Sequence, residues 1–334
     1  MIQLDPFWLC TNSIPLKDPV RVIRIAKELG FRNVELSAID GNNEQIVAEE
    51  VTPAFVGKIA SVLDREHVRC IALSAHTDLT DDACFARFLK KVRFAGEIGA
   101  SQINTRCGPK KDMDAFLRHI RELIPILERY GLQLNLESYG DIVNDAASSA
   151  HVFQILGHPL LRYNYDAGNL YRFTHGKLDF EEDLPKGIPY LGCIHLKDVV
   201  MRDGYLYNTA VGRGVVGYDG ILETLSAYRT SVAAGLEVPL GFRVRDIDLF
   251  KQIIPADQGM AEKMILRSAA YLETLGVLET TKKNGDYCNE STTCNDPADE
   301  FCETGRHSRF SEGKCSRRAG GVHHGFHDSG RRAG

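Results

Sequence analysis

Short apolar segments alternate with longer amphipathic segments along the first 280 residues, and this alternation restricts the fold more than any other feature of the sequence. The apolar segments are typical of buried strands and span residues 7–12, 33–37, 69–76, 101–106, 132–138, 161–166, 191–197 and 233–238. Helical periodicity fills stretches between them, among them 18–30, 81–99, 112–131 and 261–276. Each of these four stretches ends in a glycine, which readily adopts the left-handed conformation that closes a helix. Eight strands that alternate with helices predict an α/β protein, a (β/α)8 TIM barrel built on a parallel sheet.

An open, doubly wound sheet is the alternative fold for such an alternation. That fold usually carries a glycine-rich phosphate-binding turn after an early strand, and neither GxGxxG nor GxxxxGKS/T occurs where one is needed. The barrel is therefore favoured for residues 1–280. Apolar periodicity is lost after residue 280, and the sequence ends in a Gly-, Arg- and His-rich stretch. Residues 281–334 are therefore predicted to be a disordered tail.

Composition and charge exclude several classes of protein. Hydrophobic residues make up 43% of the 334-residue chain and charged residues 25%, as in an ordinary globular protein. The net charge of −5 gives no electrostatic reason to expect nucleic acid as a partner. No apolar run reaches about 18 residues, so no membrane-spanning segment is predicted. The start, MIQLDPFWLCTN, has an acid where a signal peptide needs basic residues, which predicts a cytoplasmic protein.

The predicted strands carry polar residues on the face that would point into the barrel. Residues two apart in a strand share a face, so Gln133, Asn135 and Glu137 oppose the three leucines of residues 132–138. A barrel interior filled only for stability is usually branched and apolar, and barrel active sites form at the C-terminal ends of the strands. Four strands end in a carboxylate or an imidazole, namely Glu137, Asp166, His195 and Glu237. Three carboxylates and one imidazole suit Mn²⁺, Mg²⁺ or Co²⁺, with room for two substrate oxygens.

At these four residues the chain resembles the sugar phosphate isomerase/epimerase family, the xylose-isomerase-like barrels. The resemblance covers about residues 1–280 and is carried by LNLES, NYDAGN, IHLKD and GLEVPL, which surround the four residues in this order. It implies that Glu137, Asp166, His195 and Glu237 are the ligands of one divalent metal. Mn²⁺ is the expected ion, with Mg²⁺, Co²⁺ and Zn²⁺ as alternatives. It also implies a small sugar substrate. A homo-oligomer and a small accessory subunit are two alternatives for its protein partners.

The resemblance implies proton abstraction from a ketose or keto-sugar, with the resulting enediolate stabilised by the metal. Glu137 and Glu237 are the candidate acid/base pair. Return of the proton to the opposite face gives an epimer, and return to the neighbouring carbon gives an isomer. Expulsion of a β-leaving group makes the enzyme a lyase instead, as in inosose dehydratases and C-glycoside-cleaving subunits. An apurinic-site endonuclease shares the barrel, but it needs further His and Asp ligands that are missing here.

Other residues are candidates for binding the substrate. The set comprises His76, Asn104, Arg106, Asn169, Lys197, Arg213 and Arg243. Each has a plainer alternative: a structural histidine, a solvated lysine, a surface salt bridge for Arg243, or a mobile Gly-rich connection (211–220) around Arg213. Asn169 departs from many epimerase relatives, which carry His three residues after the aspartate ligand. Asparagine cannot exchange a proton, which leaves room for isomerase or lyase chemistry.

Overall fold

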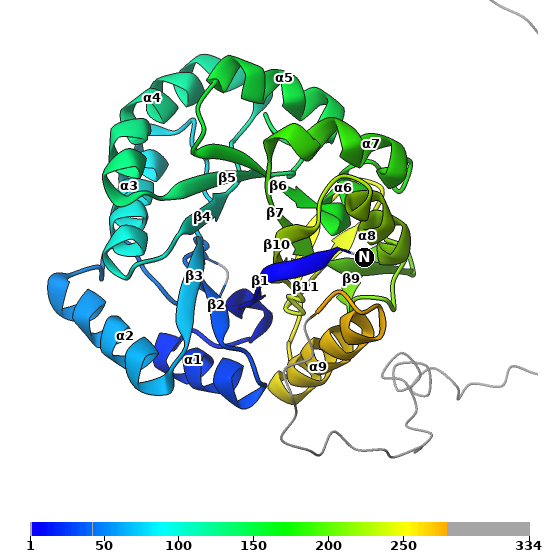
Figure 1. Cartoon of the computed structure of the whole chain (residues 1–334), viewed down its shortest axis with the longest axis horizontal. Helices are drawn as coiled ribbons and strands as arrows, with labels where there is room; N and C mark the ends of the chain where they lie inside the picture. Colours follow the sequence, from blue (N-terminus) through cyan, green and yellow to red (C-terminus); the bar gives the residue numbers. More distant parts are fainter. Residues whose placement is uncertain (1, 42, 279–334) are drawn as a thin grey trace, which may run out of the picture. The chain divides into compact units, whose positions relative to one another are not determined.

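A closed barrel of eight parallel strands forms the centre of the protein (Figure 1). The computed structural model describes residues 2–41 and 43–278, so the predicted tail from residue 281 lies outside the described residues. Around the barrel the strands follow the order β1-β10-β7-β6-β5-β4-β3-β2. Their bounds are β1 Gln3–Cys10, β2 Asn33–Ser37, β3 Arg69–Ser74, β4 Gln102–Thr105, β5 Gln133–Glu137, β6 Leu161–Asp166, β7 Leu191–Leu196 and β10 Ser231–Leu236. The predicted fold is thus confirmed, with all eight expected strands.

Helices surround the strands in an outer ring (Figure 1). Their bounds are α1 Pro19–Glu28, α2 Pro53–Glu66, α3 Asp82–Glu97, α4 Met113–Tyr130, α5 Ala146–Leu156, α6 Ala167–Phe173, α7 Phe180–Gly187, α8 Tyr218–Ser226 and α9 Gln258–Thr274. Short 3-10 turns occupy Thr11–Ser13, Lys110–Asp112 and Ile188–Tyr190. Asp18 starts α1 by accepting a hydrogen bond from the Val20 amide at 2.9 Å, and Pro19 fixes the first turn. At the other end of a helix, Gly131 closes α4 with a φ of 63°, as its place in the sequence predicts.

A second, four-stranded antiparallel sheet accompanies the barrel and was not predicted. It has the order β12-β11-β9-β8, with β8 Asp198–Arg202, β9 Tyr205–Thr209, β11 Phe242–Arg245 and β12 Lys251–Ile253. These strands have three to five residues each and mix charged with apolar side chains, so they lack a clear period. One signal was available: Asp203 and Gly204 join β8 to β9 with φ of 48° and 75°, and Asp-Gly favours such a hairpin turn.

The interior of the barrel is polar, as strand parity predicts. Asn135 donates hydrogen bonds to Gln102 (2.8 Å) and to Asn104 (2.7 Å), and Gln133 donates to Asn135 (2.8 Å). The side chain of Asn135 packs directly against the backbone of Gly192 in β7. A Cβ on Gly192 would stand 2.2 Å from the Asn135 side-chain oxygen. An amide network therefore replaces the branched apolar layers common in barrels, and it lies beneath the strand ends that carry the candidate ligands.

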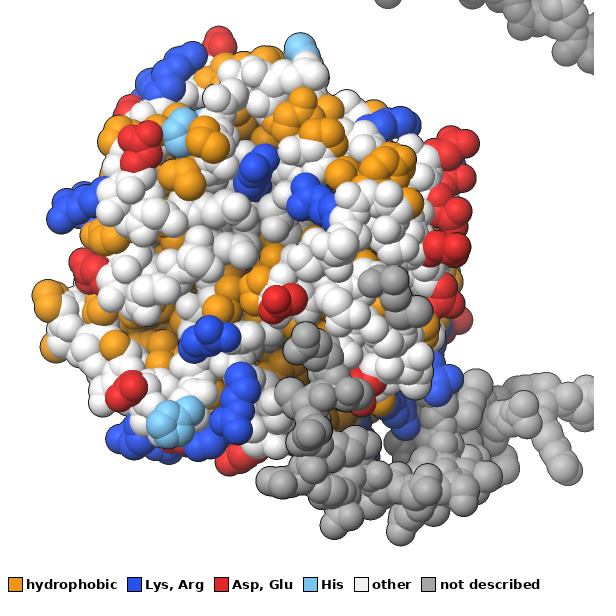
Figure 2. Space-filling view, in the orientation of Figure 1, with side chains coloured by type: hydrophobic (Ala, Val, Ile, Leu, Met, Phe, Trp, Pro, Cys, Tyr) orange, Lys and Arg blue, Asp and Glu red, His pale blue; other side chains and the backbone are white. Residues whose placement is uncertain are grey.

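On one face of the protein, the basic side chains are scattered rather than gathered in one patch (Figure 2). Figure 2 shows basic side chains singly or in small groups on one face, and acidic side chains gathered along one edge of it. The described residues on that face thus form no broad basic surface of the kind that binds nucleic acid. Among the described residues, none of the helices combines the length and apolar character needed to cross a membrane.

Candidate metal centre

Four neighbouring strands bring the predicted ligands together. Glu137 ends β5, Asp166 ends β6, His195 lies in β7 and Glu237 follows β10. One ligand atom from each residue lies within 4.8 Å of the others. All four side chains are buried, with exposures of 0–3%. Residues far apart in the chain meet because parallel strands deliver their C-terminal ends to one rim of the barrel.

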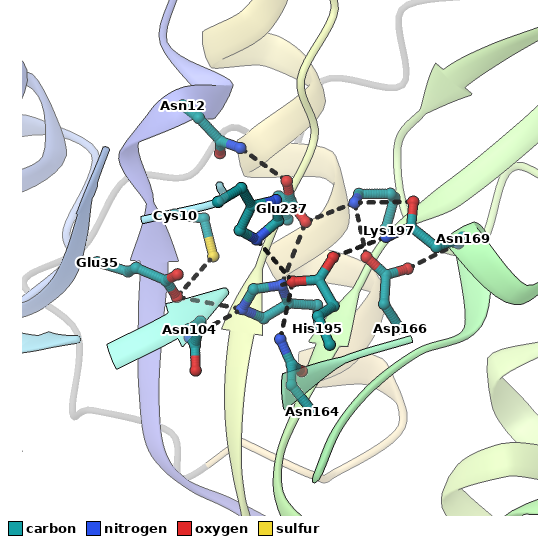
Figure 3. A network of polar contacts seen from close by, with 12 residues as sticks. Cys10, Asn12, Glu35, Asn104, Asn164, Asp166, Asn169, His195, Lys197 and Glu237 are labelled. Carbon is teal, nitrogen blue, oxygen red and sulfur yellow. Dashed lines mark hydrogen bonds and ion pairs between the residues drawn. The ribbon is translucent and has the colours of Figure 1, made fainter. Parts of the chain in front are cut away.

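His195 stands at the middle of this cluster (Figure 3). Its Nδ1 lies 3.2 Å from Glu137 Oε2 and 3.3 Å from Glu237 Oε2. Its Nε2 lies 3.1 Å from Glu35 Oε2, on the other edge of the ring. Asn104 Nδ2 lies 3.3 Å from the same Nε2. The imidazole thus presents one nitrogen to the predicted ligands while the other is held by Glu35.

Glu35 was missed by the sequence analysis. It lies in β2 with an exposure of 0% and accepts hydrogen bonds from Trp8 Nε1 (2.7 Å) and Cys10 Sγ (3.4 Å). Strand parity offered a signal, because residues 33, 35 and 37 share a face and Glu35 is the acid on it. Histidines that bind metals commonly donate their second nitrogen to a carboxylate, which fixes the tautomer and the ring orientation.

The electrostatics of the centre reflect opposite charges enclosed together. Burial opposes ionisation of Glu137, yet the charges of His76 and His195 and hydrogen bonds from both hold its pKa well below the ordinary value. Burial likewise opposes ionisation of Glu237, whose pKa is lowered by Lys197 and His195. Burial raises the pKa of Asp166 to about 6. Lys197 lowers this pKa, and the negative charges of Glu137 and Glu237 offset part of that lowering. Negative charge therefore crowds this site.

The residues present fit a divalent metal ion. His195 Nδ1 and Glu237 Oε2 are buried, and neither has a hydrogen-bond partner among the described residues. These two atoms lie 3.3 Å from each other, which is ion-pair distance, but without hydrogen-bond geometry. One imidazole and three carboxylates make a ligand set of oxygen and nitrogen donors suited to Mn²⁺ or Mg²⁺.

Four predicted substrate residues surround the predicted ligands. His76 Nε2 lies 3.0 Å from Glu137 Oε2, and Asn104 contacts His195 as described above. Asn169 donates to Glu137 Oε1 at 2.7 Å, so it positions the carboxylate by a hydrogen bond. Lys197 Nζ lies 2.6 Å from both Asp166 Oδ2 and Glu237 Oε2. The structure therefore brings His76, Asn104, Asn169 and Lys197 to the site.

A cavity of about 450 Å³ opens beside the ligands. Its walls are formed by Asn12, Ile39, Asp40, His76, Thr77, Asp78, Cys84, Arg106, Tyr139, Asn169, Arg172, Lys197, Glu237, Pro239, Phe242 and Lys251. Arg106, another predicted substrate residue, lies on this wall, 3.4 Å from Asp141 and over the Tyr139 ring. Asn12 donates to Glu237 Oε1 at 2.7 Å. Asn12, Arg172 and Lys251 were not singled out in the sequence.

Two predicted substrate residues lie elsewhere. Arg213 is exposed and is not part of the cavity wall, because Asp198 anchors its loop by accepting hydrogen bonds from the Gly212, Gly214 and Val216 amides. Arg243 belongs to β11, where it donates to Tyr207 (2.6 Å) and Gln252 (2.8 Å) and stacks over Tyr205. The structure thus does not bring Arg213 or Arg243 to the centre.

Solved structures with the same barrel include several enzymes. A D-allulose 3-epimerase from Methylomonas sp. in complex with D-allulose is 13% identical, with 82% of this chain and 98% of that chain covered and a TM-score of 0.61. A probable 3-DHS dehydratase from Bacillus anthracis is 16% identical, with coverages of 80% and 98% and a TM-score of 0.58. A xylose isomerase-like TIM barrel protein from Mycobacterium smegmatis in complex with magnesium is 18% identical, with coverages of 75% and 88% and a TM-score of 0.58. At such identities the likeness shows the fold.

The family of the chain is shown by a match between its sequence and a family model. No curated protein matches the chain. Residues 23–253, more than half of the chain, match the family described as Xylose isomerase-like TIM barrel. This agrees with the resemblance noted in the motifs around the four ligands. The chain therefore belongs to the xylose isomerase-like TIM barrel family.

Proposed function

We propose that the protein is a divalent-metal-dependent isomerase or epimerase that acts on a ketose or keto-sugar. The observation that carries this proposal is the clustering of Glu137, Asp166, His195 and Glu237, with ligand atoms within 4.8 Å of one another. Glu237 also lines a cavity of about 450 Å³, a volume that suits a small sugar. The D-allulose 3-epimerase and the magnesium-bound protein that share the fold support a sugar substrate and a divalent ion, with Mn²⁺ as our preferred ion.

Proton transfer is the task of Glu137 and Glu237 in this proposal. A bound divalent metal supplies stabilisation of the negative charge that develops on a ketose carbonyl oxygen. Both carboxylates have lowered pKa values, so both are ionised and competent as bases. One of them removes the proton next to the carbonyl, and the other, protonated from solvent, gives a proton to the substrate. The first carboxylate then releases its proton to solvent, so no net proton is gained or lost. Separate hydrogen bonds hold the pair, from Asn169 to Glu137 and from Asn12 to Glu237.

A lyase acting on an oxidised sugar or inosose is the second candidate, and Lys197 is the observation that favours it. Its ammonium lies 2.6 Å from both Asp166 and Glu237 and lines the cavity. An ammonium in this place can give a proton to a departing oxygen, which an elimination needs. Asn169, which cannot carry that proton, stands 3.4 Å from Lys197 Nζ.

Product analysis tests the proposal. The full chain is incubated with Mn²⁺ or with a chelator, and a panel of ketoses and oxidised sugars is followed by NMR. We expect a metal-dependent epimer or isomer from at least one ketose. An alkene as the sole product would instead favour the lyase, and equal turnover with the chelator would contradict metal dependence.

A further inference from the structure

Two basic side chains on one wall of the cavity have no acidic partner among the described residues. Arg172 lies in α6 and Lys251 in β12, and both contact the Phe242 ring from β11. The Arg172 guanidinium carbon lies 5.7 Å from the ring centre, and Lys251 Nζ lies 4.2 Å from it. The aromatic ring therefore holds both cations at the same part of the wall.

Arg172 is buried, and within the described residues one of its donors has no hydrogen-bond partner. The side chain is 6% exposed, and its Nε has no hydrogen-bond partner in the described part of the chain. Within residues 2–41 and 43–278, no carboxylate lies within ion-pair distance of Arg172 or Lys251. A buried guanidinium with free donors is costly, and its planar fork is suited to a carboxylate or a phosphate.

Other charges on the cavity wall already have partners. Asp40 is paired with Lys91 at 2.5 Å, and Arg106 lies 3.4 Å from Asp141. Asp78 accepts hydrogen bonds from the Thr80 amide and hydroxyl at 2.9 and 2.6 Å. Within the described residues, Arg172 and Lys251 are therefore the cations of this wall that no carboxylate balances at ion-pair distance.

Lys251 behaves as part of a cationic group. Loss of hydration and the like charges of Arg172 and Lys197 hold the pKa of Lys251 below its ordinary value. The three cations are thus near enough to repel one another, and a bound anion would relieve that repulsion.

We propose that Arg172 and Lys251 bind an anionic group, a carboxylate or a phosphate, carried by the sugar substrate. The inference rests on the proposed function for the identity of the substrate as a ketose. It adds that the preferred ketose is acidic, a keto-sugar acid or a ketose phosphate. The metal ligands and this cationic pair then hold two parts of one molecule, because Glu237 and Arg172 line the same cavity.

Equilibrium binding of a matched series tests this inference without requiring turnover. D-fructose, D-fructuronate and D-fructose 6-phosphate share a skeleton and differ in carrying a neutral, a carboxylate or a phosphate group at carbon 6. Each is titrated calorimetrically into the full chain loaded with Mn²⁺ and into chelator-treated protein. We expect at least one anionic sugar to bind about tenfold or more tighter than fructose, as a charge-assisted contact allows. Which of the two binds distinguishes a carboxylate from a phosphate site.

Variants assign the preference to the residues. Arg172→Gln removes the buried charge, and Lys251→Gln removes the exposed charge. If Arg172→Gln fails to fold, Lys251→Gln still tests the inference. Each is expected to lower the affinity for the anionic sugar about tenfold and to leave fructose unchanged. Arg121→Gln, an exposed position on α4 outside the cavity wall, is the matched control.

The inference is overturned if neither anionic sugar binds tighter than fructose, or if Lys251→Gln and a folded Arg172→Gln both keep the preference. A failure of the proposed reaction is distinguishable from a failure of this inference, because the titrations measure binding and not turnover. A protein that prefers the anionic sugar but never exchanges a substrate proton retains this inference and loses the proposed function.

Discussion

Glu35 and His195 lie within hydrogen-bonding distance, with Glu35 Oε2 3.1 Å from His195 Nε2, and this contact turns Nδ1 of the ring toward Glu137 and Glu237. Trp8 fixes Glu35 in turn through a 2.7 Å hydrogen bond. A carboxylate in this position orients a metal-binding histidine and raises its basicity. The strength of metal binding should therefore depend on Glu35, although Glu35 is not among the four predicted ligands.

Glu35→Gln is expected to weaken Mn²⁺ binding about 10- to 100-fold while the barrel stays folded. The neutral amide still fills the space but no longer attracts the imidazole N–H with a full charge. Calorimetric titration with Mn²⁺ measures the change, and circular dichroism checks the fold. Glu128→Gln, at an exposed position on α4, serves as the matched control. Unchanged affinity in Glu35→Gln would show that the contact does not support metal binding.

Gly235 provides the space in which this arrangement is packed. A Cβ at this position would stand 2.5 Å from Trp8 Nε1, 2.8 Å from Cys10 Sγ and 3.0 Å from His195 Cδ2. Gly235→Ala should therefore destabilise the protein by about 1–3 kcal/mol and displace the ring of His195. Urea unfolding measures the first effect, and Mn²⁺ titration measures the second.

The matched glycine substitution has the opposite expected sign. A Cβ on Gly57, inside α2, would meet nothing within 4 Å. Gly57→Ala should stabilise the protein by about 0.5–1 kcal/mol, because alanine has the higher helix propensity. Equal effects of the two substitutions would contradict the close packing around Gly235.

The Asp40–Lys91 pair links the cavity wall to the stability of the fold. Lys91 is fully buried, and its Nζ lies 2.5 Å from Asp40 Oδ1 and donates to the Ala38 carbonyl at 2.6 Å. Asp40→Asn should destabilise the protein by about 2–3 kcal/mol at pH 7, because it leaves a buried ammonium without its nearest counter-charge. Asp64→Asn, on the exposed side of α2, is the control.

The pH dependence of this pair has a definite sign. Burial opposes ionisation of Asp40, but Lys91 and Arg87 outweigh it and lower the pKa below the ordinary value. The ionised carboxylate therefore stabilises the folded chain at neutral pH, and this contribution is lost as the pH falls below the ordinary aspartate range. The difference in unfolding free energy between wild type and Asp40→Asn should shrink on acidification from pH 7 to about pH 3. A difference that stays constant over this range would refute the pairing.

Metal loading should stabilise the folded protein, because the four predicted ligands come together only when the barrel is folded. At free Mn²⁺ of 100 times its Kd the expected gain is about 2.7 kcal/mol. A chelator should remove that gain from the wild type in a thermal unfolding assay. Asp166→Asn preserves the shape of one ligand but removes its charge, so its melting temperature should respond little to Mn²⁺ or to the chelator. A full response in this variant would place the metal elsewhere.

The barrel and the meeting of four candidate ligands at one rim were predictable because both depend on local periodicity. Strand parity placed Glu137, Asp166 and His195 at strand ends, and the order of eight strands implied that these ends meet. Glu35 follows the same strand parity. No distinctive sequence motif surrounds it, however, so the sequence did not mark it as a site residue. Arg172 lies in a short helix after Asp166, where strand parity gives no information.

Loop geometry was beyond the reach of the sequence. Arg213 and Arg243 follow strand ends in the chain, which made them candidates for the cavity. Their positions are decided by contacts distant in sequence: Asp198 binds the loop of Arg213, and Tyr207 and Gln252 bind Arg243 within the second sheet. The contacts of Arg243 belong to the second sheet, in which β8, β9, β11 and β12 pair.

Solvent deuterium exchange tests the central claim most directly. The Mn²⁺-loaded protein is incubated in D₂O with the ketose it turns over best, and NMR follows deuterium at the carbon next to the carbonyl. Glu137→Gln and Glu237→Gln are compared with Glu128→Gln, and each protein is also measured after chelation. We predict exchange in wild type and in Glu128→Gln, and its loss on chelation and in both other variants. Exchange that persists in Glu137→Gln and Glu237→Gln, or without metal, would contradict proton transfer by these carboxylates at a metal centre.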